Sequence, residues 1–258
     1  MEHNFERDVK NAFSKAFANT EIFVYDTVGS TNDEARSFAL ANSGRDAFFI
    51  AREQTAGRGR RGRSFISREG GLYISYLLHP KLSVKDSIML TVFSAVALSE
   101  TIEELTSAKP KIKWVNDLFL GGKKIAGILA EGGFKGDGDG FEYAVVGIGV
   151  NLLGKELDPE IQRIASTLEK EIGIAVDIAD FALRFAKKLS SFEEELSDSY
   201  MRSYRERSAV VGKRVKMTSA GDEFYCDVLR IEDDGAITVK LDSGEEKSFY
   251  SAEVSVAL

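Results

Sequence analysis

The stretch AFFIAREQTAGRGRRGRSFISREGGLYISYLL occupies residues 47–78 and decides the fold. Its two ends, residues 47–53 and 72–78, are apolar runs typical of buried β-strands. Between them, four arginines and three glycines fall within residues 57–63, which we call the Gly/Arg loop. Glycine lets backbone N–H groups approach an anion closely, and arginine adds donors that keep their charge. The stretch therefore predicts two buried strands joined by a loop that holds phosphates or a carboxylate.

The overall charge favours a small anion over a nucleic acid as the partner of this loop. The chain has 258 residues, with 34 lysines and arginines against 41 aspartates and glutamates, so its net charge is −7. An acidic body repels a long polyanion. A solvated surface loop and a nucleic-acid patch are the two alternatives, and the position of the loop between buried strands argues against both. The spacing also departs from the P-loop pattern of nucleotide-binding proteins.

Three features of the whole chain indicate a folded protein of a reducing compartment. Hydrophobic residues make up 43% and charged residues 29%, which is typical of a globular protein. The single cysteine, Cys226, excludes an intramolecular disulfide. The first residues, MEHNFERDVK, lack the apolar run of a signal peptide, and no later run is long enough to span a bilayer. We therefore expect a cytoplasmic protein without membrane contact.

Hydrophobic periodicity predicts an α+β arrangement for most of the chain. Helices are expected over residues 5–17, 31–41 and 83–105, with short helices over 158–170 and one long helix over 177–207. Strands are expected over residues 22–26, 47–53, 72–78 and 144–152. Residues 111–131 predict a strand, a Gly-Gly turn and a second strand. The glycine-rich segment 132–141 predicts an exposed hairpin loop, and the sequence assigns no role to it.

The pattern changes after Gly212, where short strand-like runs separated by Gly/Asp turns replace the helices. These runs span residues 214–218, 224–231, 236–241 and 247–256. They predict a small β-barrel, with Cys226 in its core. We place the boundary so that residues 1–210 form one domain and residues 211–258 form the second, which is small enough to require packing on the first.

Several short polar motifs have both a ligand-binding and a structural interpretation. Ser30, Thr31 and Asn32 can cap a helix or present polar groups to a ligand at its N-terminus. Asn116 and Asp117, next to Lys113, can form a turn or hold Mg²⁺ and phosphate oxygens. In the other two motifs, Lys124 begins an apolar strand and Gly147-Ile148-Gly149 precedes Asn151. Lys124 is interpreted either as the solvated end of a strand or as a cation that meets a bound anion. For Gly147 and Gly149, a role in packing is favoured over cofactor binding.

The order of these motifs along the chain resembles that of the biotin protein ligase family, the biotin–acetyl-CoA-carboxylase ligases. The resemblance covers roughly residues 20–256 and rests on these segments: Ser30-Thr31-Asn32, residues 53–63, Lys113-Trp114-x-Asn116-Asp117, residues 124–131, Gly147-Ile148-Gly149-x-Asn151 and Ala165-Ser166-x-Leu168. It implies a mixed β-sheet flanked by helices, similar to class II synthetases and shared with lipoate ligases, followed by a small C-terminal SH3-like β-barrel.

The resemblance also implies a two-step acyl transfer. Biotin reacts with ATP, assisted by Mg²⁺, to give biotinyl-5′-AMP and pyrophosphate. A lysine of a biotin carboxyl carrier protein, as in acetyl-CoA carboxylase, then displaces AMP. No tightly bound prosthetic group, DNA or membrane is expected as a partner, and the sequence leaves a monomer and a homodimer both open.

The family's site residues carry over onto matching positions of this chain. The resemblance implies that biotin contacts Ser30, Thr31, Asn32, Gln54, Arg58, Gly59, Arg60, Lys124 and Gly127. It implies ATP contacts from Arg58, Arg61, Arg63, Lys113, Asn116, Asp117 and Asn151, with Asp117 also at Mg²⁺. Lys124 and Arg60 are the expected catalytic residues, and residues 154–168 resemble the segment that closes over adenine.

Two positions depart from the family pattern, and two functions remain as alternatives. Phe65 stands where the family often has Trp, and Val115 stands where it commonly has Pro. Lipoate protein ligase shares the expected catalytic fold, and a non-catalytic biotin sensor would bind biotin without releasing pyrophosphate. Only about 20 residues precede the first expected strand, too few for three helices of about 11 residues each. We therefore expect no N-terminal DNA-binding domain and no repressor function.

Overall fold

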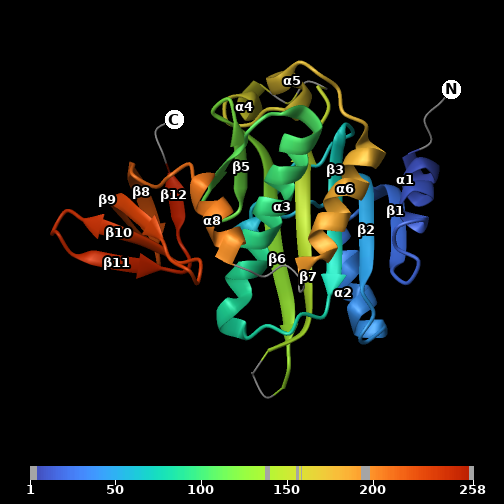
Figure 1. Cartoon of the computed structure of the whole chain (residues 1–258), viewed down its shortest axis with the longest axis horizontal. Coiled ribbons are helices and arrows are strands. Elements are labelled where there is room, and N and C mark those ends of the chain that lie inside the picture. The colour runs from blue at the N-terminus through green and yellow to red at the C-terminus, as the bar shows by residue number, and fades with distance from the viewer. Residues whose placement is uncertain (1–4, 137–139, 155–156, 158, 193–197, 256–258) are drawn as a thin grey trace.

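The structure is a computed structural model that describes residues 5–136, 140–154, 157, 159–192 and 198–255. Its larger part is built on a seven-stranded sheet with the order β1-β2-β3-β7-β6-β5-β4 (Figure 1). The strands are β1 (Glu21–Val28), β2 (Ala47–Gln54), β3 (Gly71–Leu78), β4 (Lys111–Lys113), β5 (Asp117–Leu120), β6 (Lys123–Phe134) and β7 (Phe141–Asn151). β1 pairs in parallel with β2, and the other neighbours are antiparallel. The expected mixed sheet is confirmed.

Helices cover both faces of this sheet (Figure 1). Within the described residues, the α-helices are α1 (Phe5–Ser14), α2 (Thr31–Ala41), α3 (Ile88–Thr106), α4 (Pro159–Gln162), α5 (Leu168–Ile172), α6 (Ile178–Ser190) and α8 (Asp198–Glu206). Two 3₁₀ turns, η1 (Arg60–Gly62) and η2 (Val84–Ser87), precede longer elements. α3 packs against α6 and α8, and α1 packs against α6. α2 packs against β2, β3 and β7 through a separate small core.

The C-terminal part is a five-stranded antiparallel sheet, which we call the C-terminal sheet. It consists of β8 (Arg214–Ser219), β9 (Asp222–Ile231), β10 (Ile237–Leu241), β11 (Glu246–Phe249) and β12 (Glu253–Ser255), in the order β11-β10-β9-β8-β12. This confirms that the C-terminal part is a small all-β unit. Cys226 is fully buried in it, as expected. None of the helices in the described ranges is long and apolar enough to cross a membrane.

The segment expected to be one strand before the Gly-Gly turn is in fact two strands. β4 and β5 pair with each other, and Lys113 lies opposite Asp117 across a tight reversal. Trp114 and Val115 form this turn, and both are buried. Two consecutive apolar residues are typical of a buried strand, which explains why the sequence predicted a continuous strand. Asn116 fixes the reversal because its Nδ2 donates to the carbonyl of Ile128 at 2.9 Å. The Trp114–Val115 peptide bond in this turn is cis.

Other boundaries differ from those expected from the sequence. The helix predicted over residues 177–207 is wrong as a single element, because α6 ends at Ser190 and α8 begins at Asp198. The Ser190 and Ser191 hydroxyls bond to carbonyls of the preceding turn, which competes with continuing the helix. The hairpin loop is shorter than predicted, since β6 extends to Phe134 and β7 begins at Phe141; residues 137–139 of that loop lie outside the described residues.

Candidate active site

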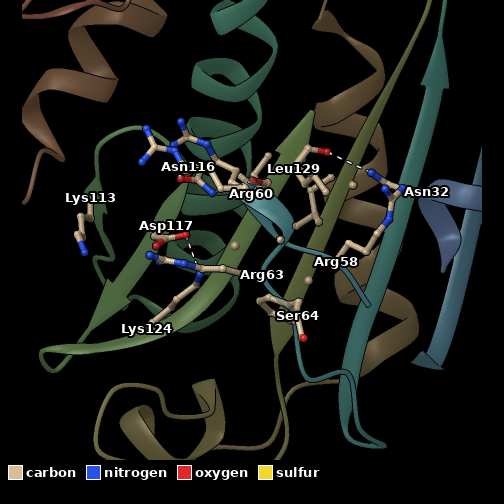
Figure 2. Close-up of a pocket in the computed structure, with 18 of the residues that line it drawn as sticks. Asn32, Arg58, Arg60, Arg63, Ser64, Lys113, Asn116, Asp117, Lys124 and Leu129 are labelled. Atoms are coloured by element: carbon tan, nitrogen blue, oxygen red, sulfur yellow. Dashed lines mark hydrogen bonds and ion pairs between the residues drawn. The ribbon is translucent and has the colours of Figure 1, made fainter. Parts of the chain in front are cut away.

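A cavity of about 240 Å³ lies where the seven-stranded sheet, which we call the main sheet, meets the Gly/Arg loop and the C-terminal sheet (Figure 2). Its walls come from the start of α2, the Gly/Arg loop, the β4–β5 turn, the first half of β6, the middle of β7 and strand β12. Segments more than two hundred positions apart in the sequence therefore share one site. The predicted site residues in its lining are Ser30, Thr31, Asn32, Gln54, Arg58, Gly59, Arg60, Arg61, Arg63, Lys113, Asn116, Asp117, Lys124 and Gly127.

One end of the cavity is an uncharged polar network at the N-terminus of α2. The backbone N–H and the hydroxyl of Thr31 both donate to Gln54 Oε1, at 2.8 and 3.1 Å. Ser30 is the N-cap, but its side chain makes no capping bond. The Thr31 hydroxyl does not cap the helix either, because it donates to Gln54 on β2. This arrangement leaves polar groups at the helix N-terminus beside the cavity.

Two buried serines support this network and were missed from the sequence. Ser75 is fully buried, and its hydroxyl lies 2.7 Å from both Thr31 Oγ1 and Asn32 Oδ1. Ser67 accepts from Gln54 Nε2 at 2.9 Å and donates to the carbonyl of Phe65 at 2.9 Å. The available signal was Ser75 itself, a serine within the apolar run of β3, because a buried hydroxyl requires a hydrogen-bond partner.

Glycines on β6 and β7 make room for the side chains that cover the cavity. A Cβ at Gly149 would lie 2.5 Å from the Phe65 ring, and one at Gly127 would lie 3.0 Å from Lys124 Nζ. A Cβ at Gly147 would collide with the amide of Asn32. The Gly147-Ile148-Gly149 motif therefore serves packing, as the sequence favoured.

The other end of the cavity is strongly cationic. Lys124 Nζ lies 2.7 Å from Asp117 Oδ1 and 5.6 Å above the centroid of the Phe65 ring. Arg60 Nη1 donates to Asn116 Oδ1 at 3.1 Å. Lys113 also lines the cavity, although its side chain lies apart from Arg60 and Asn116 in Figure 2. Burial lowers the pKa of both Arg60 and Lys113, because their charged forms lose hydration, and the positive charge of Arg61 lowers that of Arg60 further. Desolvated cations gathered around one carboxylate form a site for an additional anion.

The remaining arginines of the Gly/Arg loop are paired with carboxylates. Arg58 Nη2 lies 2.7 Å from Asp33 Oδ1 and 3.1 Å from Glu131 Oε2. Arg63 Nη2 lies 2.6 Å from Glu253 Oε2 on β12. The loop is a compact turn, with the N–H of Gly59 bonded to the carbonyl of Arg63 at 2.7 Å. Most residues of the loop are exposed, but all four of its arginines line the cavity, so the loop is part of the candidate site.

Comparisons with known proteins agree with this geometry. A model described as the biotin/lipoate A/B protein ligase family matches residues 26–151, and one described as the biotin protein ligase C terminal domain matches residues 210–256. The biotin–acetyl-CoA-carboxylase ligase of Paracoccus denitrificans is 32% identical over 227 residues, which cover 84% of this chain and 93% of that protein. The chain belongs to the biotin protein ligase family.

Two further relatives extend this result over nearly the whole chain. The bifunctional ligase/repressor BirA of Bacillus subtilis is 28% identical over an alignment of 258 positions, which covers 97% of this chain and 78% of that protein. The biotin protein ligase of Aquifex aeolicus, solved in complex with biotin and ATP, superposes with a TM-score of 0.76 at 27% identity. That match covers 91% of this chain and 97% of the Aquifex chain. The similarity therefore includes both the main sheet and the C-terminal sheet.

One residue expected in the ligase site lies outside the cavity lining. Asn151, at the end of β7, donates from Nδ2 to the carbonyl of Ser166 at 3.2 Å. The backbone of Ser166 in turn donates to the carbonyl of Lys124 at 3.0 Å. In the described part of the chain, the Ser166 hydroxyl is buried without a hydrogen-bond partner. Asn151 thus holds the segment around Ser166 against the strand that carries Lys124.

Proposed function

We propose that this protein activates biotin with ATP to form biotinyl-5′-AMP and then transfers biotin to a lysine of a biotin carboxyl carrier protein. The observation that carries the proposal is the layout of the cavity, which joins a neutral polar end to a cationic end. Biotin has a polar bicyclic head and an anionic tail, and ATP adds a triphosphate. One end of the cavity suits the head, and the other suits the two anions that must react.

At the neutral end, we propose that Ser30, Thr31 and Gln54 bind the head of biotin. One N–H of Gln54 Nε2 is committed to Ser67, and an amide nitrogen carries two, so the second can serve a ligand carbonyl. In the structure, Ser30 is buried and borders the cavity. The apolar wall comes from Ile128 and Leu129, which also line the cavity.

At the cationic end, we propose that Lys124 bridges the biotin carboxylate and the α-phosphate, while Arg60 holds the adenylate. The two reacting groups repel each other, so fixed cations aimed at the developing charge lower the barrier. Holding both reactants in one cavity also removes an entropic barrier of up to about 7–11 kcal/mol. Arg58, Arg61, Arg63, Lys113 and Asn116 complete the proposed contacts to carboxylate and phosphates, and Gly59 and Gly127 give the ligand close access to the backbone.

The proposed Mg²⁺ ion would be held by Asp117 together with phosphate oxygens. Mg²⁺ commonly takes one or two protein carboxylates and completes its shell with phosphates and water. Among the described residues, no group of three or more His, Cys, Asp and Glu side chains could hold a metal ion without such help. Asp117 would supply the carboxylate, and because cations surround it, the ion would bind there only together with phosphates whose negative charge offsets theirs. The ion would neutralise phosphate charge there.

The wider setting is also proposed. Residues 1–210 would form the catalytic domain and residues 211–258 the C-terminal domain, with the acceptor a carrier domain of a carboxylase. The single cysteine of the chain, buried and free, suits the cytoplasm, where thiols stay reduced.

Pyrophosphate exchange with biotin and lipoate, measured side by side, tests this function. We expect exchange of labelled pyrophosphate into ATP with biotin and little with lipoate. Preference for lipoate would make the protein a lipoate ligase, although the match of residues 210–256 to a biotin ligase C-terminal domain favours biotin. Biotin binding without any exchange would indicate a non-catalytic sensor. Transfer is tested by labelling a purified carboxyl carrier domain and its lysine-to-alanine variant.

A further inference from the structure

Glu131 links the two ends of the proposed biotin-binding region. It lies on β6, and its carboxylate oxygen Oε2 accepts from Asn32 Nδ2 at 2.7 Å and from Arg58 Nη2 at 3.1 Å. Asn32 comes from the start of α2 and Arg58 from the Gly/Arg loop, and the two side chains lie together in Figure 2. Glu131 itself is not part of the cavity lining. It therefore acts on the cavity through these two neighbours.

The contacts of Asn32 determine which way its amide faces. Its Nδ2 donates to Glu131 and, at 3.4 Å, to the carbonyl of Leu129, while the Ser75 hydroxyl lies 2.7 Å from Oδ1. Both N–H bonds of the amide are thus used within the protein. Because an amide oxygen has two lone pairs, Oδ1 keeps one for a ligand N–H. A negative charge at Glu131 selects this orientation, since it accepts only from the nitrogen.

The Gly/Arg loop is tied to the same network at both of its ends. On the far side, the chain Gln54–Ser67–Phe65 ends at the Phe65 carbonyl, just after the loop. At the first end of the loop, Glu131 accepts a hydrogen bond from Arg58, the first arginine of the loop. A chain of polar groups within hydrogen-bond distance of one another therefore runs from one end of the loop to the other by way of Asn32, Ser75 and Thr31.

We infer that Glu131 is a positioning residue of the ligase reaction, which orients Asn32 for an N–H of the biotin head and tethers Arg58 beside the biotin carboxylate. This inference rests on the proposed function. In this role, Glu131 makes no contact with the reacting atoms of biotin and ATP. Its loss therefore weakens biotin binding and leaves the chemical step, carried by Lys124 and Arg60, largely unchanged.

The test is Glu131→Gln, which keeps the shape of the side chain and removes its charge. Glu142→Gln is the matched control, because Glu142 is exposed on the neighbouring strand β7. We expect the KM for biotin in pyrophosphate exchange to rise about tenfold, as for a lost charge-assisted hydrogen bond. The kcat and the KM for ATP should stay within about twofold of wild type, since ground-state binding alone is affected. Glu142→Gln should match wild type in all three.

A double-mutant cycle with Arg58→Ala separates positioning from a general effect on the fold. If Glu131 acts through Arg58, the effect of Glu131→Gln on the KM for biotin should shrink to within about threefold in the Arg58→Ala background. An undiminished tenfold effect there would remove Arg58 from the inference. Thermal melting of each variant checks folding, and Glu131→Asp, which keeps the charge but shortens the reach, supplies a second variant with an expected smaller rise.

The outcomes also distinguish this inference from the proposed function. If the wild-type protein shows no biotin-dependent exchange, the proposed function fails. If wild type is active and Glu131→Gln has the same KM for biotin as Glu142→Gln, the ligase assignment stands and the positioning role of Glu131 is wrong.

Discussion

At the scale of single residues, Lys124 is the cation closest to Asp117 in the structure, and its replacement gives the sharpest test of the chemistry. Lys124→Met keeps the length and much of the volume of the side chain and removes its charge. We expect the rate of pyrophosphate exchange to fall by about 10²–10³-fold, as for the loss of one preorganised donor at a reacting group. Lys123→Met is the control, because Lys123 precedes it on β6 and bonds to the carbonyl of Arg163. Equal activity of both variants would remove Lys124 from the reaction.

Arg60 separates the two half-reactions at the same scale. Its guanidinium donates to Asn116, and the residue is partly buried at the cationic end of the cavity. In Arg60→Gly we expect biotinyl-5′-AMP still to form, because Lys124 remains, and to escape about ten- to a hundredfold faster. Released mixed anhydride reacts with exposed amines, so serum albumin should become biotinylated. Streptavidin detection at matched turnover measures this, and albumin labelling equal to wild type would show that another residue retains the intermediate.

The same scale shows what a single sequence can and cannot reveal about a site. The cluster of Lys113, Asp117 and Lys124 was predictable, because the three lie within twelve consecutive residues and match a known series of motifs. Ser75 and Glu131 were not assigned roles, since their partners at the start of α2 lie 43 and 99 residues away in the sequence. The spacing of residues along the chain predicts which of them are neighbours within one helix or strand. It does not predict which strands become adjacent in the sheet.

At the scale of elements, β7 and the Gly/Arg loop are matched through Gly149 and Phe65. A Cβ at Gly149 would lie 2.5 Å from the Phe65 ring, closer than real Cβ contacts, so the ring must move. In Gly149→Ala we expect Phe65 to leave its position under Lys124 and the KM for biotin to rise about tenfold through lost packing and cation–π contact. Gly136→Ala, where a Cβ meets nothing within 4 Å, is the control. An unchanged KM in Gly149→Ala would mean that Phe65 does not cover biotin.

Element boundaries were predictable where periodicity was uninterrupted, and they were wrong where a turn was made of apolar residues. The runs that became β2 and β3 were located from their composition, because β3 is buried along its whole length and β2 over its first five residues. The reversal between β4 and β5 was missed because Trp114 is apolar and buried at 3% exposure, like a strand residue. Its indole N–H donates to the carbonyl of Gly235 at 2.9 Å. That long-range partner, rather than a local signal, explains a tryptophan in a turn.

At the scale of the whole molecule, the main sheet and the C-terminal sheet share one hydrophobic core. A single cluster of buried residues includes Phe93 and Ile128 from the larger part together with Cys226 and Val239 from the C-terminal sheet. Polar links cross the same boundary, such as the bond from Arg205 Nε to the carbonyl of Ile231 at 2.7 Å. A shared core of this kind favours one cooperative unfolding transition over separate melting of a small β-unit.

Urea unfolding with two single-site probes tests this cooperativity. Cys226 is the one cysteine of the sequence, and burial raises the pKa of its thiol to about 11, so at pH 8 it should be protonated and unreactive toward a disulfide reagent. Unfolding restores a thiol pKa of about 8.5 and exposes the sulfur. In the described residues every α-helix precedes residue 207, so circular dichroism at a helical wavelength reports the larger part.

We expect Cys226 reactivity, helical signal and Trp114 fluorescence to change at the same urea midpoint. Thiol exposure about 1 M below the loss of helix would mean that the C-terminal sheet opens on its own. The Cys226→Ser variant, which has no thiol, measures the background signal of the thiol assay. A signal from this variant equal to that of wild type would mean that the assay does not detect Cys226.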